Sequence, residues 1–140
     1  MAAVSADLYV EVQMFYARQI AMLDGGDFEG FAGTFLADGV FRPAGGRAEV
    51  SGREIIAKAS EAASGRFEGA QPRHWFDMLR VMPEADGGIR TNYYAAISVT
   101  AADGSTRWEP TCVVEDELVR TDGQLANRSR TVVRDDLSLH

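Results

Sequence analysis

Two side chains in this sequence, those of Asp24 and His74, have the chemistry that acid–base catalysis needs. Tyr16, Ile20 and Asp24 recur four residues apart, so they lie on one stripe of a helix. Ile20 belongs to the apolar face, so the Asp24 carboxylate and the Tyr16 hydroxyl are predicted to face the interior. A carboxylate there is costly unless it is paired. The alternative hypothesis is that Asp24 only caps the end of its helix, through backbone amides near Gly26.

His74 is the second candidate, and the only other histidine is His140. It opens a strand-like segment in which alternation puts His74, Phe76 and Met78 on one face. Imidazole titrates near neutral pH and can accept or donate a proton, which dehydration and enolisation both require. The alternative hypothesis is that His74 is a core residue with a structural hydrogen bond.

Further residues are candidates for contact with a ligand. Tyr16 is a candidate donor to a carbonyl or to a developing oxyanion, or else a packed core residue. Asn92 and Tyr94 share a face of the next strand-like segment and are candidates to bind a substrate oxygen. The aromatic and soft walls of the predicted site are Phe41, Trp75, Phe76, Met78 and Trp108, each with core packing as its alternative role.

The charged residues near the end of the chain are expected to have structural roles. Arg128 and Arg130 stand on one face of the last strand-like segment, where pairing with surface acids such as Glu115 or Glu117 is the usual outcome. Asp116 is expected to maintain the fold rather than to catalyse.

Composition excludes several classes of function. The chain has 140 residues, a formal charge of −7 and 46% apolar residues, which predicts one folded domain over residues 1–140. There is no basic footprint for nucleic acid or for anionic lipid. The single cysteine excludes an internal disulfide, and no Cys/His cluster indicates a metal site.

The beginning of the chain indicates its compartment. It has no basic region typical of a signal peptide, and Asp7 and Glu11 interrupt its apolar run. No segment approaches the ~18 apolar residues of a membrane helix. We therefore expect a cytoplasmic protein that does not insert into membranes.

Helical periodicity covers the first half of the chain. A helix is predicted over 6–23, with Ser5 as its cap and a Gly-Gly end at 25–26. Asp27 is predicted to cap a second helix with an apolar stripe of Phe28, Phe31, Phe35 and Leu36. A short strand pair is expected over 40–43 and 47–50. A third helix should follow, with Ser51 and Glu54 as its capping box and an end near residue 65.

Strand periodicity covers the second half. The segments 73–82, 89–100, 108–120 and 125–134 are rich in β-branched and aromatic residues, and Asp-Gly turns separate them. This order predicts an α+β fold, in which three N-terminal helices pack on one face of a curved, mainly antiparallel sheet.

Six segments together carry a resemblance to a known superfamily. They are FYAR (15–18), LDGGDF (23–28), FLADGVF (35–41), VSGREII (50–56), RHW (73–75) and EDELVRTDG (115–123). On these residues, nearly the whole chain resembles the NTF2-like or SnoaL-like superfamily, whose fold is a cone-shaped α+β barrel. It looks closest to the branch that holds scytalone-dehydratase-like proteins and the β subunits of ring-hydroxylating dioxygenases.

The resemblance implies roles for the two candidates. In the scytalone-dehydratase-like pattern the aspartate pairs with the histidine, which makes Asp24 the orienting carboxylate and His74 the general base. The second histidine of that pattern has no counterpart here. The implied function is a cofactor-independent enzyme that dehydrates, cyclises or isomerises a hydrophobic small molecule of polyketide or aromatic secondary metabolism.

The resemblance also leaves two other functions open. One is a non-catalytic β-type subunit of a ring-hydroxylating dioxygenase, and the other is a pericyclase-like cavity without acid–base residues. A homodimer is also expected. The alternating Val, Ile and Tyr residues over 93–99 offer an outer sheet face for a second copy.

Overall fold

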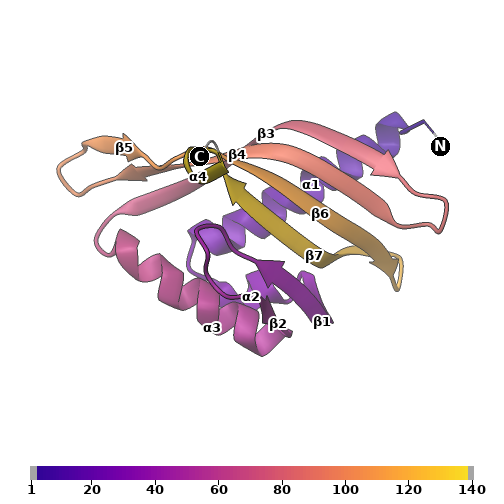
Figure 1. Ribbon diagram of the computed structural model, residues 1–140, viewed down its shortest axis with the longest axis horizontal. Coiled ribbons are helices and arrows are strands. Elements are labelled where there is room, and N and C mark those ends of the chain that lie inside the picture. Colours follow the sequence, from indigo (N-terminus) through magenta and orange to yellow (C-terminus); the bar gives the residue numbers. More distant parts are fainter. Residues whose placement is uncertain (1–2, 139–140) are drawn as a thin grey trace.

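The computed structural model describes residues 3–138, in which four helices, a 3₁₀ turn and seven strands are present; His140 lies outside them. Helix α1 (Ala6–Asp24) passes behind the long strands in the view of Figure 1. The Ser5 hydroxyl accepts the amide hydrogen of Leu8, and this confirms the predicted cap. Among these residues, no helix has both the length and the apolar content to cross a membrane.

The second helix is shorter than predicted. Asp27 caps α2 (Phe28–Ala32) through the Gly30 amide, as expected. Phe35 and Leu36, however, belong to strand β1 (Phe35–Arg42) and not to the helix. The Thr34 carbonyl accepts a hydrogen bond from the backbone amide of Asn127, and Phe35 pairs with Asn127 in parallel register. This segment therefore forms part of the sheet instead of extending the helix.

The third helix also begins differently. Strand β2 (Val50–Ser51) pairs with β1, and α3 (Arg53–Ser64) follows, with a 3₁₀ turn η1 (Gly65–Phe67). The predicted Ser51 capping box is wrong, because Ser51 is held in β2 and Gly52 is the residue before the helix, without a side-chain cap. Gly52 has a φ of 89°, a conformation that glycine adopts without strain.

The remaining strands form a meander. They are β3 (Gln71–Pro83), β4 (Ile89–Thr100), β5 (Thr106–Trp108), β6 (Cys112–Thr121) and β7 (Gln124–Arg134), before helix α4 (Asp135–Ser138). The strand predicted over 108–120 is two strands. Trp108 pairs with β4 as the end of a hairpin, and Pro110, which has no amide hydrogen for the ladder, lies in the break before β6.

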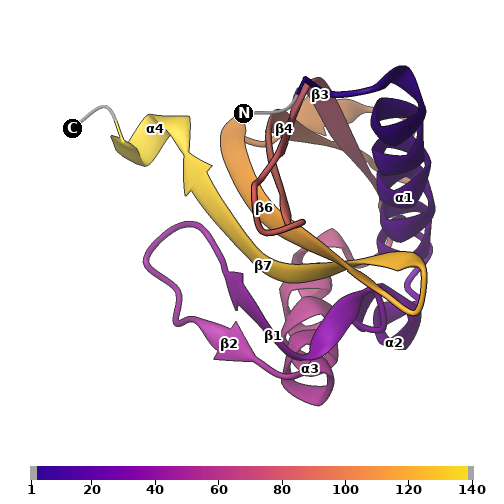
Figure 2. The ribbon, with the colours of Figure 1, turned by 90° about the vertical axis from the view of Figure 1, so that its right-hand side faces the viewer.

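The sheet is curved, mixed and unclosed. Its order is β2-β1-β7-β6-β4-β3, with β5 on β4; only the β1–β7 pair is parallel among the described strands. In Figure 2 the long strands curl toward α1, while α2 and α3 lie at one end of the interior. This confirms the predicted α+β class and the helices on one face of the sheet.

A bulge in β3 reverses which residues face inward. Asp77 pairs with Tyr94 and Arg80 pairs with Asn92, so β3 has one extra residue between these pairs. Met78 takes a φ of 54° there, which is unusual for a residue with a side chain. His74 and Phe76 face inward before the bulge, whereas Met78 is exposed and Val81 is buried after it.

Candidate active site

Asp24 and His74 are in direct contact. Oδ1 of Asp24 lies 2.6 Å from Nδ1 of His74, and Oδ2 accepts the backbone amide hydrogen of His74 at 3.0 Å. The side chains are only 6% and 18% exposed. Helix α1 supplies the carboxylate from its last residue, and β3 supplies the imidazole from its inner face. Two bonds to one partner fix both the position of the ring and its orientation.

The contact leaves the other ring nitrogen available. An Nδ1–H that donates to Asp24 defines the neutral tautomer in which Nε2 carries the lone pair. Nε2 of His74 has no hydrogen-bond partner among residues 3–138. The hairpin amides bond instead to backbone carbonyls, Gly26 to Leu23 and Asp27 to Met22. The Asp24 side chain thus serves His74 rather than the hairpin.

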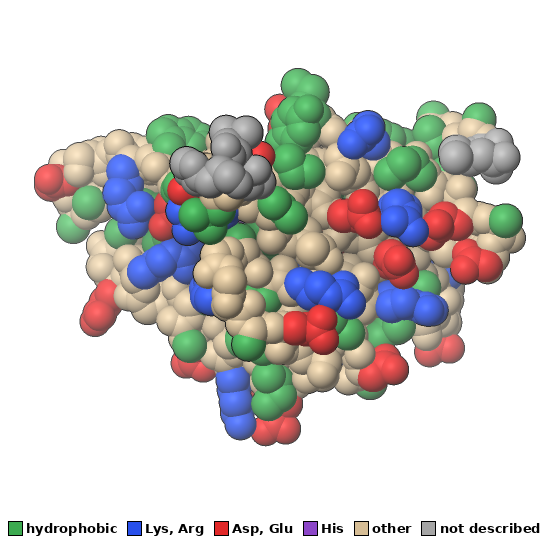
Figure 3. Space-filling view, viewed as in Figure 1, with side chains coloured by type: hydrophobic (Ala, Val, Ile, Leu, Met, Phe, Trp, Pro, Cys, Tyr) green, Lys and Arg blue, Asp and Glu red, His purple; other side chains and the backbone are tan. Residues whose placement is uncertain are grey.

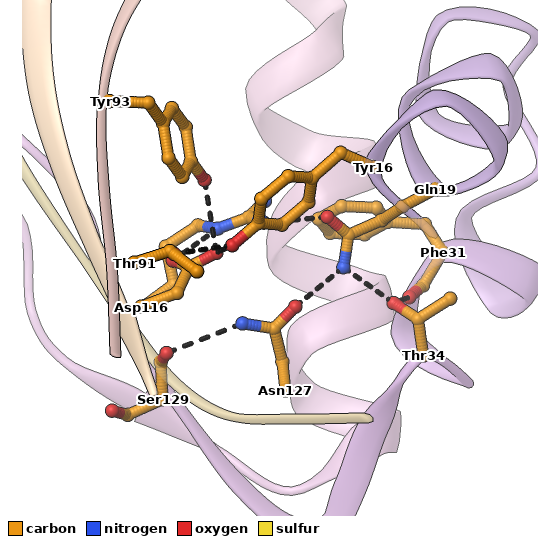
Figure 4. Close-up of polar contacts among 10 residues, drawn as sticks. Tyr16, Gln19, Phe31, Thr34, Thr91, Tyr93, Asp116, Asn127 and Ser129 are labelled. Atoms are coloured by element: carbon orange, nitrogen blue, oxygen red, sulfur yellow. Dashed lines mark hydrogen bonds and ion pairs between the residues drawn. The ribbon is translucent and has the colours of Figure 1, made fainter. Parts of the chain in front are cut away.

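Tyr16 faces the interior, as predicted, but its hydroxyl is occupied. It donates to Oδ2 of Asp116 at 2.6 Å and lies 2.5 Å from the hydroxyl of Thr91. Tyr93 donates to the same carboxylate oxygen at 3.0 Å (Figure 4). Burial, and then the Asp116 charge, raise the pKa of Tyr16 well above its ordinary value. Burial likewise raises the pKa of Tyr93, against the opposing effect of Arg130.

Asp116 and Arg130 form a buried ion pair at the centre of this network. Nε and Nη2 of Arg130 each donate to an Asp116 oxygen at 2.9 Å, and the side chains of Arg130 and Asp116 are 4% and 0% exposed. The expectation that Arg130 pairs with a surface acid is therefore wrong. The guanidinium carbon lies 5.5 to 6.0 Å from the ring centroids of Tyr16, Phe35, Phe76 and Tyr93.

Gln19 extends the network toward α2 and β7. Its Oε1 accepts from Nη2 of Arg130 at 2.6 Å, and its amide nitrogen donates to Thr34 and Asn127, each at 2.7 Å (Figure 4). Among residues 3–138, no fully buried side-chain nitrogen or oxygen is left without a partner. The network is a rigid polar layer between the sheet and helix α1.

Sequence reasoning missed this network, although a signal for it was present. Val114, Asp116 and Leu118 alternate in β6, so Asp116 lies on the apolar face and must have a buried cationic partner. Tyr16 and Gln19 are three residues apart in α1, which indicates a polar stripe within its buried face.

Most of the predicted ligand-contact residues are on the outside of the sheet. Trp75, Tyr94, Trp108 and Met78 are between 55% and 63% exposed. Met78 is outside because of the β3 bulge, and Trp75 and Tyr94 are outside because they alternate with inward positions. Trp108 lies in β5, all of which is exposed. Asn92 is also on the outer face, where it accepts from Arg80. These five residues do not line the interior.

Phe76 and Phe41 are the two candidates with a place inside. The Phe76 ring lies 4.4 Å from that of Tyr93 and 5.8 Å from that of Tyr16, next to His74 on the strand. Phe41 packs on Phe35 at 6.2 Å in a second apolar cluster under α3. Phe76 is thus the predicted contact residue that shares the inner face of β3 with His74.

The two best-formed hollows on the surface of residues 3–138 are open, and neither contains the pair. One, of about 450 Å³, lies between α1 and the β6–β7 turn, beside Met14 and Leu125. The other, of about 400 Å³, lies beside Arg66 and Arg107. None of the described residues form a group of His, Cys, Asp or Glu side chains that is large enough to hold a metal ion.

The charges on the surface are mixed. Acidic and basic side chains alternate over the face shown in Figure 3, without a large patch of one sign. On the outer sheet face, Arg90 lies within 4 Å of three carboxylates, those of Glu84, Glu115 and Glu117. Three carboxylates around one guanidinium leave this group with a net negative charge, on the face of the sheet opposite to the Asp24–His74 pair.

Comparison with known families identifies the fold. Residues 4–131 match the SnoaL-like domain. The chain belongs to the SnoaL-like family. This match confirms the prediction that the chain is a member of the NTF2-like or SnoaL-like superfamily. A comparison with curated proteins gives no match.

Three solved structures are similar to this SnoaL-like protein over nearly its whole length. Aln2 from a Streptomyces species is 52% identical, with a TM-score of 0.95 over 99% of this chain and 98% of Aln2. A protein from Catenulispora acidiphila, in complex with S-DNPA, is 40% identical (TM-score 0.88; 96% and 98% covered). ActVI-ORFA from Streptomyces coelicolor is 39% identical (TM-score 0.87; 92% and 98% covered).

Proposed function

We propose that this SnoaL-like protein is a cofactor-independent enzyme that moves protons on a hydrophobic, oxygenated small molecule of secondary metabolism. The reaction is dehydration, cyclisation or isomerisation through an enol or enolate. The observation that carries the proposal is the Asp24–His74 contact, with Nε2 of His74 unpartnered among residues 3–138. The similarity to a protein crystallised with S-DNPA supports a small-molecule ligand.

In the proposed reaction, Nε2 of His74 removes a proton from carbon next to a carbonyl. The imidazole becomes a cation beside the Asp24 carboxylate, which is 2.6 Å away and offsets the new charge. The proton then returns to another carbon, which isomerises the substrate, or to a leaving hydroxyl group, which departs as water. General acid–base catalysis of this kind contributes about 10²- to 10⁴-fold in rate.

Tyr16 does not fit the role of carbonyl donor in this proposal. Its single hydroxyl hydrogen is directed to Asp116, and the nearby Thr91 hydroxyl fills the remaining position. Asn92, the other candidate donor, is on the outer face. We therefore assign Tyr16 a structural role in the buried network.

We also propose that the protein is a homodimer that works in the cytoplasm. Trp75 and Trp108 lie 6.2 Å apart on the outer sheet face, and Tyr94 shares that face. Three exposed aromatic side chains on one sheet form a surface that a second copy would cover.

Two measurements test the proposed activity. Titration calorimetry with S-DNPA measures whether the protein binds the ligand of its relative. Proton NMR in heavy water measures deuterium entry into 2-tetralone, a bicyclic ketone whose acidic protons adjoin the carbonyl. We expect binding, and exchange faster than that caused by free imidazole at equal concentration. Binding without exchange would favour a pericyclase-like cavity. The absence of both binding and exchange would favour a non-catalytic subunit.

A further inference from the structure

One nitrogen of the buried Arg130 is unpartnered. Nε and Nη2 bond to Asp116 and Gln19, whereas Nη1 has no partner among residues 3–138. No fully buried side-chain nitrogen in this part of the chain lacks a partner. Nη1 must therefore reach the small accessible part of Arg130, whose total exposure is 3%. A charged donor in an aromatic interior is thus left available for a ligand.

Arg130 and His74 both border the same aromatic ring. The guanidinium carbon is 5.5 Å from the centroid of Phe76. His74 is two residues before Phe76 on the inner face of β3, which corresponds to about 7 Å along the strand. A proton acceptor and a hydrogen-bond donor therefore lie on the same inner surface of the sheet, with Phe76 near both.

The charges around Arg130 indicate which oxygen it would bind. Asp116 balances the guanidinium charge, so the pair is neutral overall and is held by Tyr16 and Tyr93. A carboxylate would meet the Asp116 charge as well as Arg130. A carbonyl oxygen is neutral when it binds and becomes negative only as a proton leaves the neighbouring carbon, which is when a fixed donor is most effective.

We propose that Nη1 of Arg130 is the oxyanion donor of the site, and that the substrate is therefore a cyclic ketone or its phenol tautomer. This inference rests on the proposed function. As Nε2 of His74 takes the proton, the C–H electron pair forms a carbon–carbon double bond. The carbonyl π pair moves to oxygen, which accepts the Nη1 hydrogen bond. For dehydration, the enolate expels a β-hydroxyl, which takes the His74 proton and leaves as water.

The first test uses the unaltered protein. The probe is 2-naphthol, a planar analogue of the enol, and the control is naphthalene, which has the same shape without oxygen. In protein labelled with ¹⁵N-arginine, we expect the Nη1–H resonance of Arg130 to shift with 2-naphthol and not with naphthalene. Equal shifts with both compounds, or no shift with either, would overturn the inference.

The second test measures the charge state of the bound phenol. A donor stabilises phenolate more than phenol, so the pKa of bound 2-naphthol should be lower in wild type than in Arg130→Lys by about one unit or more. Absorbance across a pH series reports that pKa. Equal values in the two proteins would contradict the inference, and the wild-type NMR result decides it if Arg130→Lys does not fold.

The two proposals fail separately. If wild type exchanges 2-tetralone protons but neither the Arg130 resonance nor the pKa of bound 2-naphthol changes as expected, then the proposed function stands and the oxyanion donor is wrong. If Arg130 gives both signals but wild type does not exchange protons, then the oxygen subsite stands and the proposed acid–base function is wrong.

Discussion

Both carboxylate oxygens of Asp24 bind the same residue, His74, one at the ring and one at the backbone amide. A residue that ends a helix thus contacts both the backbone and the ring of a histidine 50 positions later. This arrangement differs from a surface ion pair, because the Asp24 side chain is only 6% exposed.

The tautomer of His74 should depend on Asp24. In wild type, ¹⁵N NMR at alkaline pH should show the hydrogen on Nδ1 and a bare Nε2. In Asp24→Asn the amide can donate as well as accept, so we expect a mixture of tautomers or the reverse one. The matched control is Asp27→Asn, whose side chain caps α2 and should leave the His74 spectrum unchanged. An unchanged tautomer in Asp24→Asn would contradict the orienting role.

The buried ion pair predicts non-additive stability changes. Asp116→Leu leaves the Arg130 charge buried and unpaired, which should lower the free energy of unfolding by about 3 to 5 kcal/mol. The double variant Asp116→Leu/Arg130→Met removes both charges and should lose less than the single variant. Urea denaturation of Asp116→Leu, Arg130→Met and the double variant measures the three values. A double variant that loses the sum of the two single changes would show that the pair is not coupled.

The two buried tyrosines predict a loss of stability at alkaline pH. Their pKa values are raised in the folded protein, so above pH ~10 the unfolded state loses protons that the folded state keeps. The free energy of unfolding should then fall by up to about 1.4 kcal/mol per pH unit for each tyrosine. Urea denaturation between pH ~9 and ~11 measures the slope. The slope should decrease in Tyr93→Phe and persist in Tyr94→Phe, whose side chain is exposed.

The bulge at Met78 predicts a stabilising substitution. Met78 has a φ of 54°, which costs a residue with a side chain about 1 kcal/mol relative to glycine. Its side chain is 63% exposed, so little packing is lost in Met78→Gly. We expect that variant to raise the free energy of unfolding by up to about 1 kcal/mol. Asp77→Gly, on the neighbouring residue, should lower it, and a loss of stability in Met78→Gly would contradict the strain argument.

The proposed dimer predicts a change in mass. Trp75→Glu and Trp108→Glu place charge on the outer sheet face and should convert the dimer to monomer in sedimentation velocity. Met14→Glu is the control, because Met14 is equally exposed but lies on α1, away from that face. A wild-type protein that sediments as a monomer would remove the basis for this interface.

The sequence predicted what depends on local patterns. The α1 helix, its Ser5 cap and the Asp-Gly turns follow from periodicity and backbone preference, and the structure confirms them. The Asp24–His74 contact followed from family resemblance, since its partners are 50 positions apart. The Met78 bulge was not predictable, because strand alternation contains no signal for an inserted residue. The Arg130–Asp116 pair was not predicted, because an arginine on a strand more often pairs with a surface acid than with a buried carboxylate.

Deuterium exchange of 2-tetralone in wild type, His74→Gln and Asp24→Asn tests the central claim most directly. If Nε2 of His74 takes the proton, His74→Gln should lose about 10²- to 10⁴-fold in rate, and Asp24→Asn should lose rate through misorientation of the ring. Circular dichroism and urea denaturation establish that both variants remain folded. Folded variants that exchange as fast as wild type would show that the Asp24–His74 pair is structural and not catalytic.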